Sequence, residues 1–282
     1  MPREWLTHPA ILSCLVAVVA LAGCSSLLAS TTDAEPGSED TVTPAPVPTT
    51  GEQFPPGVTE SGVVVTTLTD THTARLRATN YTYVSRQHVV GDDEVLRRTN
   101  RTRRVATGGR RYAGRFDRTI DDFPVRALPN AIEYWTNGSV HATQRFLDGE
   151  PAVYDWSRGV QPTEDVDDSG VLSRVLRAID VSVLNRENGV TLAGTTVRTP
   201  GLLPNPPYMT TPQNVSLTAS VTDDGVVTRW RLAYDTTVEN RSVRVVRVTR
   251  ITDIGRTTVG RPAWVDTARE WEQARFRSLD GG

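Results

Sequence analysis

The stretch Val226-Val-Thr-Arg-Trp-Arg-Leu-Ala-Tyr-Asp235 decides the fold, because apolar and polar side chains alternate along it. In a β-strand, Trp230 and Tyr234 would share one face, and Arg229 and Arg231 would share the other. A strand with one apolar face is typical of an antiparallel sheet that is covered on a single side. We therefore expect Trp230 to be buried between a sheet and a helix, and Arg231 to point to solvent.

Further strands are predicted before and after this stretch. Asn137-Gly138 and Asp148-Gly149 are hairpin turn signals in the earlier group, and Asp223-Asp224-Gly225 leads into the strand of Trp230. The predicted strands are 81–90, 94–107, 111–118, 131–136, 139–146, 152–156, 214–221, 226–235 and 241–252.

Two amphipathic helices are predicted to cover the apolar face of these strands. The first spans about 67–78, with Thr66 or Thr67 as its cap, and carries His72 on its apolar stripe as a core or boundary residue. The second is capped near Asp168 or Ser169. Its apolar face consists of Val171, Leu172, Val175, Leu176 and Ile179.

Together the elements predict an α+β fold: a long curved antiparallel sheet, or half-barrel, with a few amphipathic helices packed on its concave face. We expect it to form a single domain over residues 58–282, which is long enough for a core without disulfides. Between sheet and helices we expect a candidate apolar cavity, lined by Trp230, Leu232, Leu172 and Leu176.

The beginning of the chain predicts export. Leu21-Ala-Gly-Cys24 is a lipobox, and it closes an apolar run that starts at Ala10 after a polar segment with Arg3. The run is shorter than the roughly 20 residues of a membrane-spanning helix. Residues 1–23 are therefore predicted to be a signal peptide, and Cys24 the lipidated N-terminus of the mature chain. An uncleaved signal anchor is the alternative, and it would also hold the domain outside the membrane.

The segment 24–57 is predicted to be a disordered tether behind the lipidated Cys24. From Ser25 to Glu60 the chain has six acidic residues, six prolines and no basic residue. Such a composition buries too little apolar surface to fold. The domain would thus be held at the outer face of the cell membrane by a lipid anchor, with the membrane as its expected partner.

Five sequons match the N-glycosylation pattern, which favours an exported glycoprotein, although some of them suit turns or strands. The acceptor residues are Asn80, Asn100, Asn137, Asn214 and Asn240. All 31 basic residues are Arg. This Lys-free composition behind a lipobox resembles that of surface proteins from salt-loving archaea.

No catalytic template is present, so the sequence predicts no enzyme, no cofactor and no metal site. The three histidines of the domain, His72, His88 and His141, are scattered. Asp165–Gly170 resembles the start of a calcium loop, but position twelve of that loop is Leu176 rather than the required Glu. We interpret its acids as a solvated loop that suits the dipole of the following helix.

Arginines crowd two successive predicted strands. Nucleic acid or anionic lipid would suit such a surface, but aromatic residues are few among them and a chain without Lys needs Arg at every solvated basic position. We therefore predict a solvent-facing sheet surface and no nucleic-acid partner, with attraction to anionic head groups or to the acidic tether as the remaining alternative. The arginines are Arg97, Arg98, Arg101, Arg103, Arg104, Arg110, Arg111, Arg115 and Arg118.

Two motifs carry a family resemblance. Phe54-Pro-Pro-Gly-Val-x-x-x-Gly62, followed by a helix with His72 and then Asn80-Tyr-Thr-Tyr83, resembles the start of the body in an uncharacterised family of haloarchaeal lipoproteins. Arg261-Pro-Ala-Trp-Val265 is similar to the closing motif of that family. The resemblance implies a fold similar to the bacterial outer-membrane lipoprotein carrier and to mycobacterial lipid-carrying lipoproteins, in which a half-barrel sheet wraps helices around an apolar cavity.

Two functions from different classes are consistent with the sequence. One is a non-enzymatic carrier or sensor of a lipid or other apolar ligand. The other is a structural or protein-interaction component of the cell surface, without a ligand. The large apolar residues Trp135, Trp156 and Trp230 suit either function, because they would fill a core as well as line a cavity.

Overall fold

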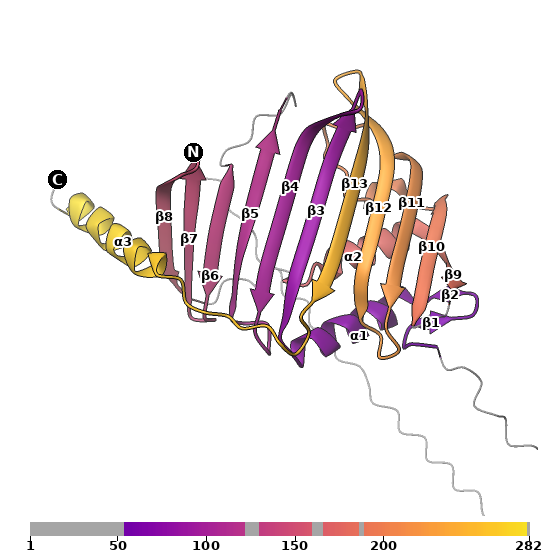
Figure 1. Ribbon diagram of the computed structural model, residues 1–282, viewed down its shortest axis with the longest axis horizontal. Helices are drawn as coiled ribbons and strands as arrows, with labels where there is room; N and C mark the ends of the chain where they lie inside the picture. The colour runs from indigo at the N-terminus through magenta and orange to yellow at the C-terminus, as the bar shows by residue number, and fades with distance from the viewer. Residues whose placement is uncertain (1–53, 122–129, 160–165, 186–188, 281–282) are drawn as a thin grey trace, which may run out of the picture. The chain divides into compact units, whose positions relative to one another are not determined.

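An eleven-stranded antiparallel sheet and three α-helices make up the fold, as expected for the α+β class (Figure 1). The structure is a computed structural model that describes residues 54–121, 130–159, 166–185 and 189–280. The strands follow the order β8-β7-β6-β5-β4-β3-β13-β12-β11-β10-β9, so the sheet is open and ends at β8 and β9. All described residues fall in one compact unit that spans residues 50–282.

All nine predicted strands are present, and β6 and β13 have the predicted bounds. The strands are β3 (Tyr81–Gly91), β4 (Glu94–Val105), β5 (Tyr112–Ile120), β6 (Ala131–Thr136), β7 (Val140–Leu147), β8 (Glu150–Arg158), β11 (Gln213–Val221), β12 (Val227–Val238) and β13 (Arg241–Thr252). Neighbouring strands are joined mostly by short turns, which is why consecutive strands pair along most of the sheet.

Two strands at the β9 edge were not predicted: β9 (Ile179–Asn185) and β10 (Val190–Val197). Ile179 was expected on the apolar face of the second helix, and this expectation is wrong. The helix ends at Ala178, and Ile179 and Val181, which are buried, begin the alternating pattern of a strand. The sequence signal for this hairpin was Asn188-Gly189.

Trp230 lies on the face of the sheet that we call the inner face. It is 3% exposed, whereas the neighbouring Arg229 is exposed, so the predicted register of this strand is confirmed. Helices α1 (Val65–Arg77) and α2 (Ser169–Ala178) contribute Leu68, Leu172 and Val175 to the same hydrophobic cluster as Trp230. The two predicted helices therefore do cover the apolar face.

The start of α1 differs from the prediction, because its N-cap is Val64 and no side chain caps it. A short hairpin of β1 (Val58–Thr59) and β2 (Gly62–Val63) runs directly into the helix, and the amide of Val64 donates to the carbonyl of Gly57 at 2.8 Å.

The packed part of the domain begins before residue 58, since Phe54 lies against the main cluster. His72 is buried, and its Nδ1 accepts a hydrogen bond from the amide of Val227 at 3.2 Å, as expected for a core histidine.

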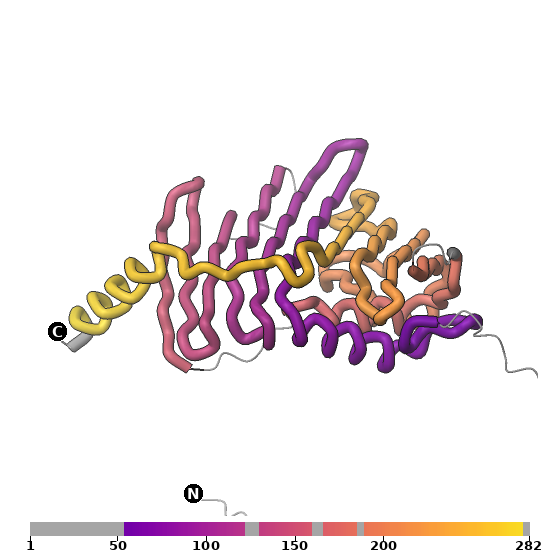
Figure 2. The backbone as a smooth tube through the Cα atoms, turned by 60° about the horizontal axis from the view of Figure 1, so that its bottom comes forward, coloured from indigo at the N-terminus to yellow at the C-terminus, as the bar shows by residue number. Residues whose placement is uncertain are grey.

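A third helix, α3 (Trp264–Asp280), was not predicted and lies on the other face of the sheet, the outer face. Val265 and Ala268 of α3 form a cluster with Trp135 and Ala142, which pair directly on β6 and β7. Trp135 comes directly after Tyr134, whose side chain lies on the inner face. Successive side chains of a strand point to opposite faces, so Trp135 lies on the outer face. Figures 1 and 2 show α1 along the β9–β13 half and α3 at the β8 end.

Among the described ranges, no helix is both long enough and apolar enough to cross a membrane.

Candidate functional site

The four residues that were predicted to line a cavity lie together beneath the helices. Trp230 and Leu232 come from β12 and are 3% and 0% exposed, while Leu172 and Leu176 come from α2 and are 1% and 4% exposed. All four belong to one continuous hydrophobic cluster. The structure thus confirms that the sequence brings these residues together.

A polar hub borders this cluster, and its centre is Asp168. The carboxylate Oδ2 of Asp168 accepts hydrogen bonds from the hydroxyl of Tyr83 on β3 and from Nη2 of Arg247 on β13. Asp168 is 5% exposed and Tyr83 is 0% exposed. Removal of one partner from such a buried ion pair strongly destabilises a protein. Because Asp168 directly precedes α2, the hub fixes the start of this helix against the sheet.

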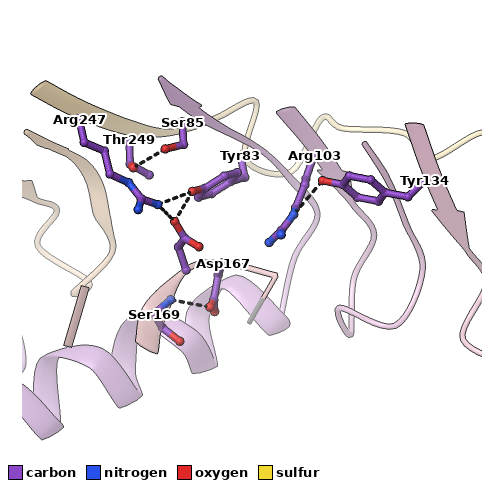
Figure 3. A network of polar contacts seen from close by, with 9 residues as sticks. Tyr83, Ser85, Arg103, Tyr134, Asp167, Ser169, Arg247 and Thr249 are labelled. Carbon is purple, nitrogen blue, oxygen red and sulfur yellow. Dashed lines mark hydrogen bonds and ion pairs between the residues drawn. The ribbon is translucent and has the colours of Figure 1, made fainter. Parts of the chain in front are cut away.

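The backbone before α2 directs Asp168 toward the sheet. Asp168 has φ 60°, in the left-handed region, and its side chain makes no capping bond. Instead Oδ1 of Asp167 accepts from the amide of Ser169 at 3.0 Å (Figure 3). For Asp167 and Asp168 the interpretation as a solvated loop is therefore wrong, because both are buried and Arg247 and Tyr83 bind the carboxylate of Asp168. Asp165 lies outside the described residues.

Arg103 on β4 extends the hub toward β6. It is 4% exposed, its Nε donates to the hydroxyl of Tyr134 at 2.9 Å, and its guanidinium lies 5.6 Å from the ring centre of Tyr83 (Figure 3). The prediction that this arginine faces solvent is wrong. Its strand partner is Gly114, where an added Cβ would lie 2.5 Å from the Tyr134 hydroxyl, so the glycine leaves room for the tyrosine.

The electrostatics of the hub keep its tyrosine neutral. Burial, and next the charge of Asp168, raise the pKa of Tyr83, whereas Arg247 opposes this rise. Burial disfavours the charged form of Arg103, but Tyr134, Tyr83 and Asp168 outweigh it and raise the pKa of that guanidinium. At neutral pH Tyr83 therefore acts as a hydrogen-bond donor, and the arginine is a cation.

Arg247 also connects the hub to the apolar cluster. Its guanidinium lies 5.1 Å from the ring centre of Trp230, a distance at which a cation is attracted to the face of an indole. Beside it, Thr249 donates to Ser85 at 3.2 Å. Among the described residues, no group of three or more His, Cys, Asp or Glu side chains is arranged to hold a metal ion.

Sequence reasoning missed the hub, although one signal was available. Val245, Arg247, Thr249 and Ile251 occupy the same face of β13, so the charge of Arg247 interrupts an inward-facing row. A charged residue at such a position needs a buried partner. The partner could not be named from the sequence, because Asp168 is 79 residues away from Arg247.

The predicted glycosylation sites lie in different surroundings. Asn80 accepts from the amide of Thr257 at 2.8 Å, Asn137 accepts from the amides of Ser139 and Val140, and Asn214 donates to Asp235 at 2.8 Å. Asn100 is half-buried on β4. Asn240 is exposed in the turn between β12 and β13. Glycosylation of any of them stays a prediction, and Cys24 lies outside the described residues.

Comparisons with known proteins give seven matching chains among solved structures. No protein-family model matches the sequence, and no curated protein matches it. A solved structure of a DUF1329 family protein from Desulfovibrio piger ATCC 29098 is weakly similar, with 12% sequence identity and a TM-score of 0.28 over 71% of this chain and 96% of that chain. We draw nothing about function from so low a TM-score. The resemblance to haloarchaeal lipoproteins stays a prediction.

Proposed function

We propose that this protein is a membrane-anchored extracytoplasmic lipoprotein that carries or senses a lipid or other apolar ligand without catalysis. One observation carries the ligand part of the proposal. Phe116 on β5 and Ile132 on β6 are directly paired on the inner face, and both are half-buried. Neither belongs to any of the three hydrophobic clusters of the described residues.

Apolar side chains in this position suit an apolar ligand. Phe116 and Ile132 lie on the same face as the Trp230 cluster, and the polar hub separates them from that cluster. A ligand that covered them would gain roughly 25 cal/mol for each Å² of apolar surface removed from water. Ligand sites are commonly concave, mostly apolar and fixed by a few polar groups, and the hub would supply such groups.

The lipobox supports the proposal that a lipid on Cys24 anchors the protein to the membrane. Cys24→Ser removes the only thiol that remains after signal cleavage, so the protein should lose stable membrane attachment. Detergent-phase partitioning of the cleaved variant and of wild type checks this. Unchanged partitioning of a cleaved Cys24→Ser protein would contradict the lipoprotein proposal. The five sequons favour exposure to a glycosylating compartment.

A second candidate function is a structural or interaction protein of the cell surface. The observation that favours it is the complete burial of Trp230, Leu232, Leu172 and Leu176, none of which is more than 4% exposed. A core of this kind stabilises a domain whether or not the domain binds a ligand.

Native mass spectrometry of the full protein, purified from its own host in a mild detergent, separates the two functions. A reproducible extra mass that corresponds to a lipid supports the carrier or sensor. A mass that consists only of protein, anchor and glycan contradicts it and supports the structural function.

A further inference from the structure

The arginines of β4 and β5 divide between the two faces of the sheet. On the outer face, Arg115 forms ion pairs with Asp117 and Glu133, each at 2.8 Å. Arg98 and Arg104 are exposed on that same face. These residues behave as solvated basic positions, which is how the sequence was interpreted.

Three arginines on the inner face have different surroundings. Arg101 and Arg118 lie over the same ring, with guanidinium carbons 5.5 and 5.1 Å from the centre of Phe116. Arg97 lies at the neighbouring position, where it faces Ile120 across the strands and its Nη1 donates to the hydroxyl of Tyr208 at 2.8 Å. We call Arg97, Arg101 and Arg118 the inner-face arginine site.

The charges of the two arginines over Phe116, Arg101 and Arg118, are not balanced by carboxylates of the described residues. Within the part of the chain that the structure describes, neither Arg101 nor Arg118 has an ion pair or a side-chain hydrogen bond. Both are half-buried. Burial, and next the charge of Arg97, lower the pKa of Arg118, although an arginine remains charged at neutral pH. Half-buried like charges repel one another, and a bound anion would relieve this repulsion.

We propose that the inner-face arginine site binds the phosphate of an anionic phospholipid, whose acyl chain lies against Phe116 and Ile132. This inference rests on the proposed carrier function and names its ligand class. Guanidinium groups present parallel N–H donors that match phosphate oxygens. The apolar pair lies directly beside the cations, because Arg101, Phe116 and Ile132 occupy neighbouring paired positions on β4, β5 and β6.

The arrangement fits a phospholipid better than a free anion. Free phosphate would use the guanidinium groups but would leave Phe116 and Ile132 half-exposed to water. A phospholipid suits both the cations and the apolar pair, since its phosphate neutralises the guanidinium groups while its acyl chain covers Phe116 and Ile132. The polar hub closes the site on the side of the filled core, with the buried Arg103 and Tyr83.

The test compares three probes on the full protein in a non-ionic detergent. The probes are dihexanoyl phosphatidylglycerol, dihexanoylglycerol without a phosphate, and inorganic phosphate, with dissociation constants measured by calorimetry. The variant is Arg101→Gln with Arg118→Gln, and the matched control is Arg98→Gln with Arg104→Gln on the outer face. We expect the inner-face variant to bind phosphatidylglycerol at least about tenfold more weakly, because it loses charged hydrogen bonds. The control and the uncharged probe should show no change.

The other outcomes contradict the inference in distinguishable ways. If the inner-face variant binds phosphatidylglycerol as wild type does, or if wild type does not prefer it to dihexanoylglycerol, the headgroup site is wrong and the carrier function stands. If inorganic phosphate alone competes as strongly as phosphatidylglycerol, the ligand is a free anion rather than a lipid. If wild type binds none of the lipid probes, the proposed function itself is contradicted.

Discussion

The two halves of the sheet are covered on opposite faces. On the β9–β13 half, α1 and α2 bury the inner face, and Trp230 and Leu232 are almost inaccessible. On the β5–β8 half, α3 packs on the outer face, against Trp135 and Ala142. The inner face there carries half-buried Phe116 and Ile132, and together with the adjoining β4 it carries the arginine site. The inner face of one continuous sheet thus belongs to a filled core in the β9–β13 half and forms a candidate ligand surface in the other half.

The polar hub lies where these two halves meet. Asp168 reaches the sheet from the start of α2, where Tyr83 of β3 and Arg247 of β13 bind it. Arg103 of β4 lies over the ring of Tyr83. The hub therefore has a structural role, because it fixes one end of the helical cover. The four predictions below test whether the halves differ in this way, and they are arranged by the size of the expected effect.

Trp230→Ala should have the largest effect on stability. It opens a cavity in the filled half and should lower the free energy of unfolding by about 3–5 kcal/mol. Arg231→Ala, at the next position of the same strand, should lower it by less than about 1 kcal/mol. Urea unfolding midpoints of both variants check the difference. Equal and small losses would show that this half is not a packed core.

Asp168→Asn should destabilise the protein by about 3 kcal/mol, because it leaves the guanidinium of Arg247 buried without a counter-charge. The matched control is Asp266→Asn, which removes an exposed ion pair with Arg261 and should cost less than about 1 kcal/mol. Chemical denaturation at neutral pH measures both. A neutral Asp168→Asn variant would mean that the hub does not hold α2.

Alkaline pH should weaken the filled half through Tyr234. Burial, which Arg97 and Arg247 only partly oppose, raises the pKa of this tyrosine from 10.0 to about 12. Because the folded pKa is the higher one, the stability that Tyr234 contributes is fully present below pH 10 and is lost as the pH rises through about 12. The loss is about 2–3 kcal/mol. Tyr234→Phe should remove this part of the pH dependence, as measured by unfolding between pH 9 and 12, and an unchanged slope would contradict the assignment.

Arg101→Gln should have the smallest effect, because this arginine has no ionic partner among the described residues. Without ligand, the free energy of unfolding should stay within about 0.5 kcal/mol of wild type. Thermal unfolding of the delipidated protein measures the change. A loss above about 1 kcal/mol would mean that Arg101 stabilises the fold rather than serving a ligand.

The sequence predicted most of the β12–β13 region and little of the hub. Alternation over residues 226–235 and the periodicity of Leu172, Val175 and Leu176 are local patterns, and local patterns are what a single sequence reveals. The cavity residues were therefore brought together correctly. The nine predicted strands depended on the same signals and on short turns between them.

The missed features depend on contacts between distant residues. Asp168 looked like an ordinary helix cap, because the sequence does not show that Tyr83 and Arg247 face it. Arg103 looked like its solvated neighbours, although Gly114 and Tyr134 make a buried place for it. Helix α3 was missed because its apolar residues include Trp264 and Val265, which were interpreted only as a motif.

The most direct test of the central claim is the amount of lipid bound to variants of the two halves. Native mass spectrometry of wild type, Ile132→Glu and Trp230→Ala, each checked for folding by circular dichroism, gives that amount. If the ligand occupies the inner face beside β5 and β6, Ile132→Glu should lose the bound lipid, whereas folded Trp230→Ala should retain it. Loss of lipid from Trp230→Ala together with full retention by Ile132→Glu would contradict the account and place the ligand beneath the helices.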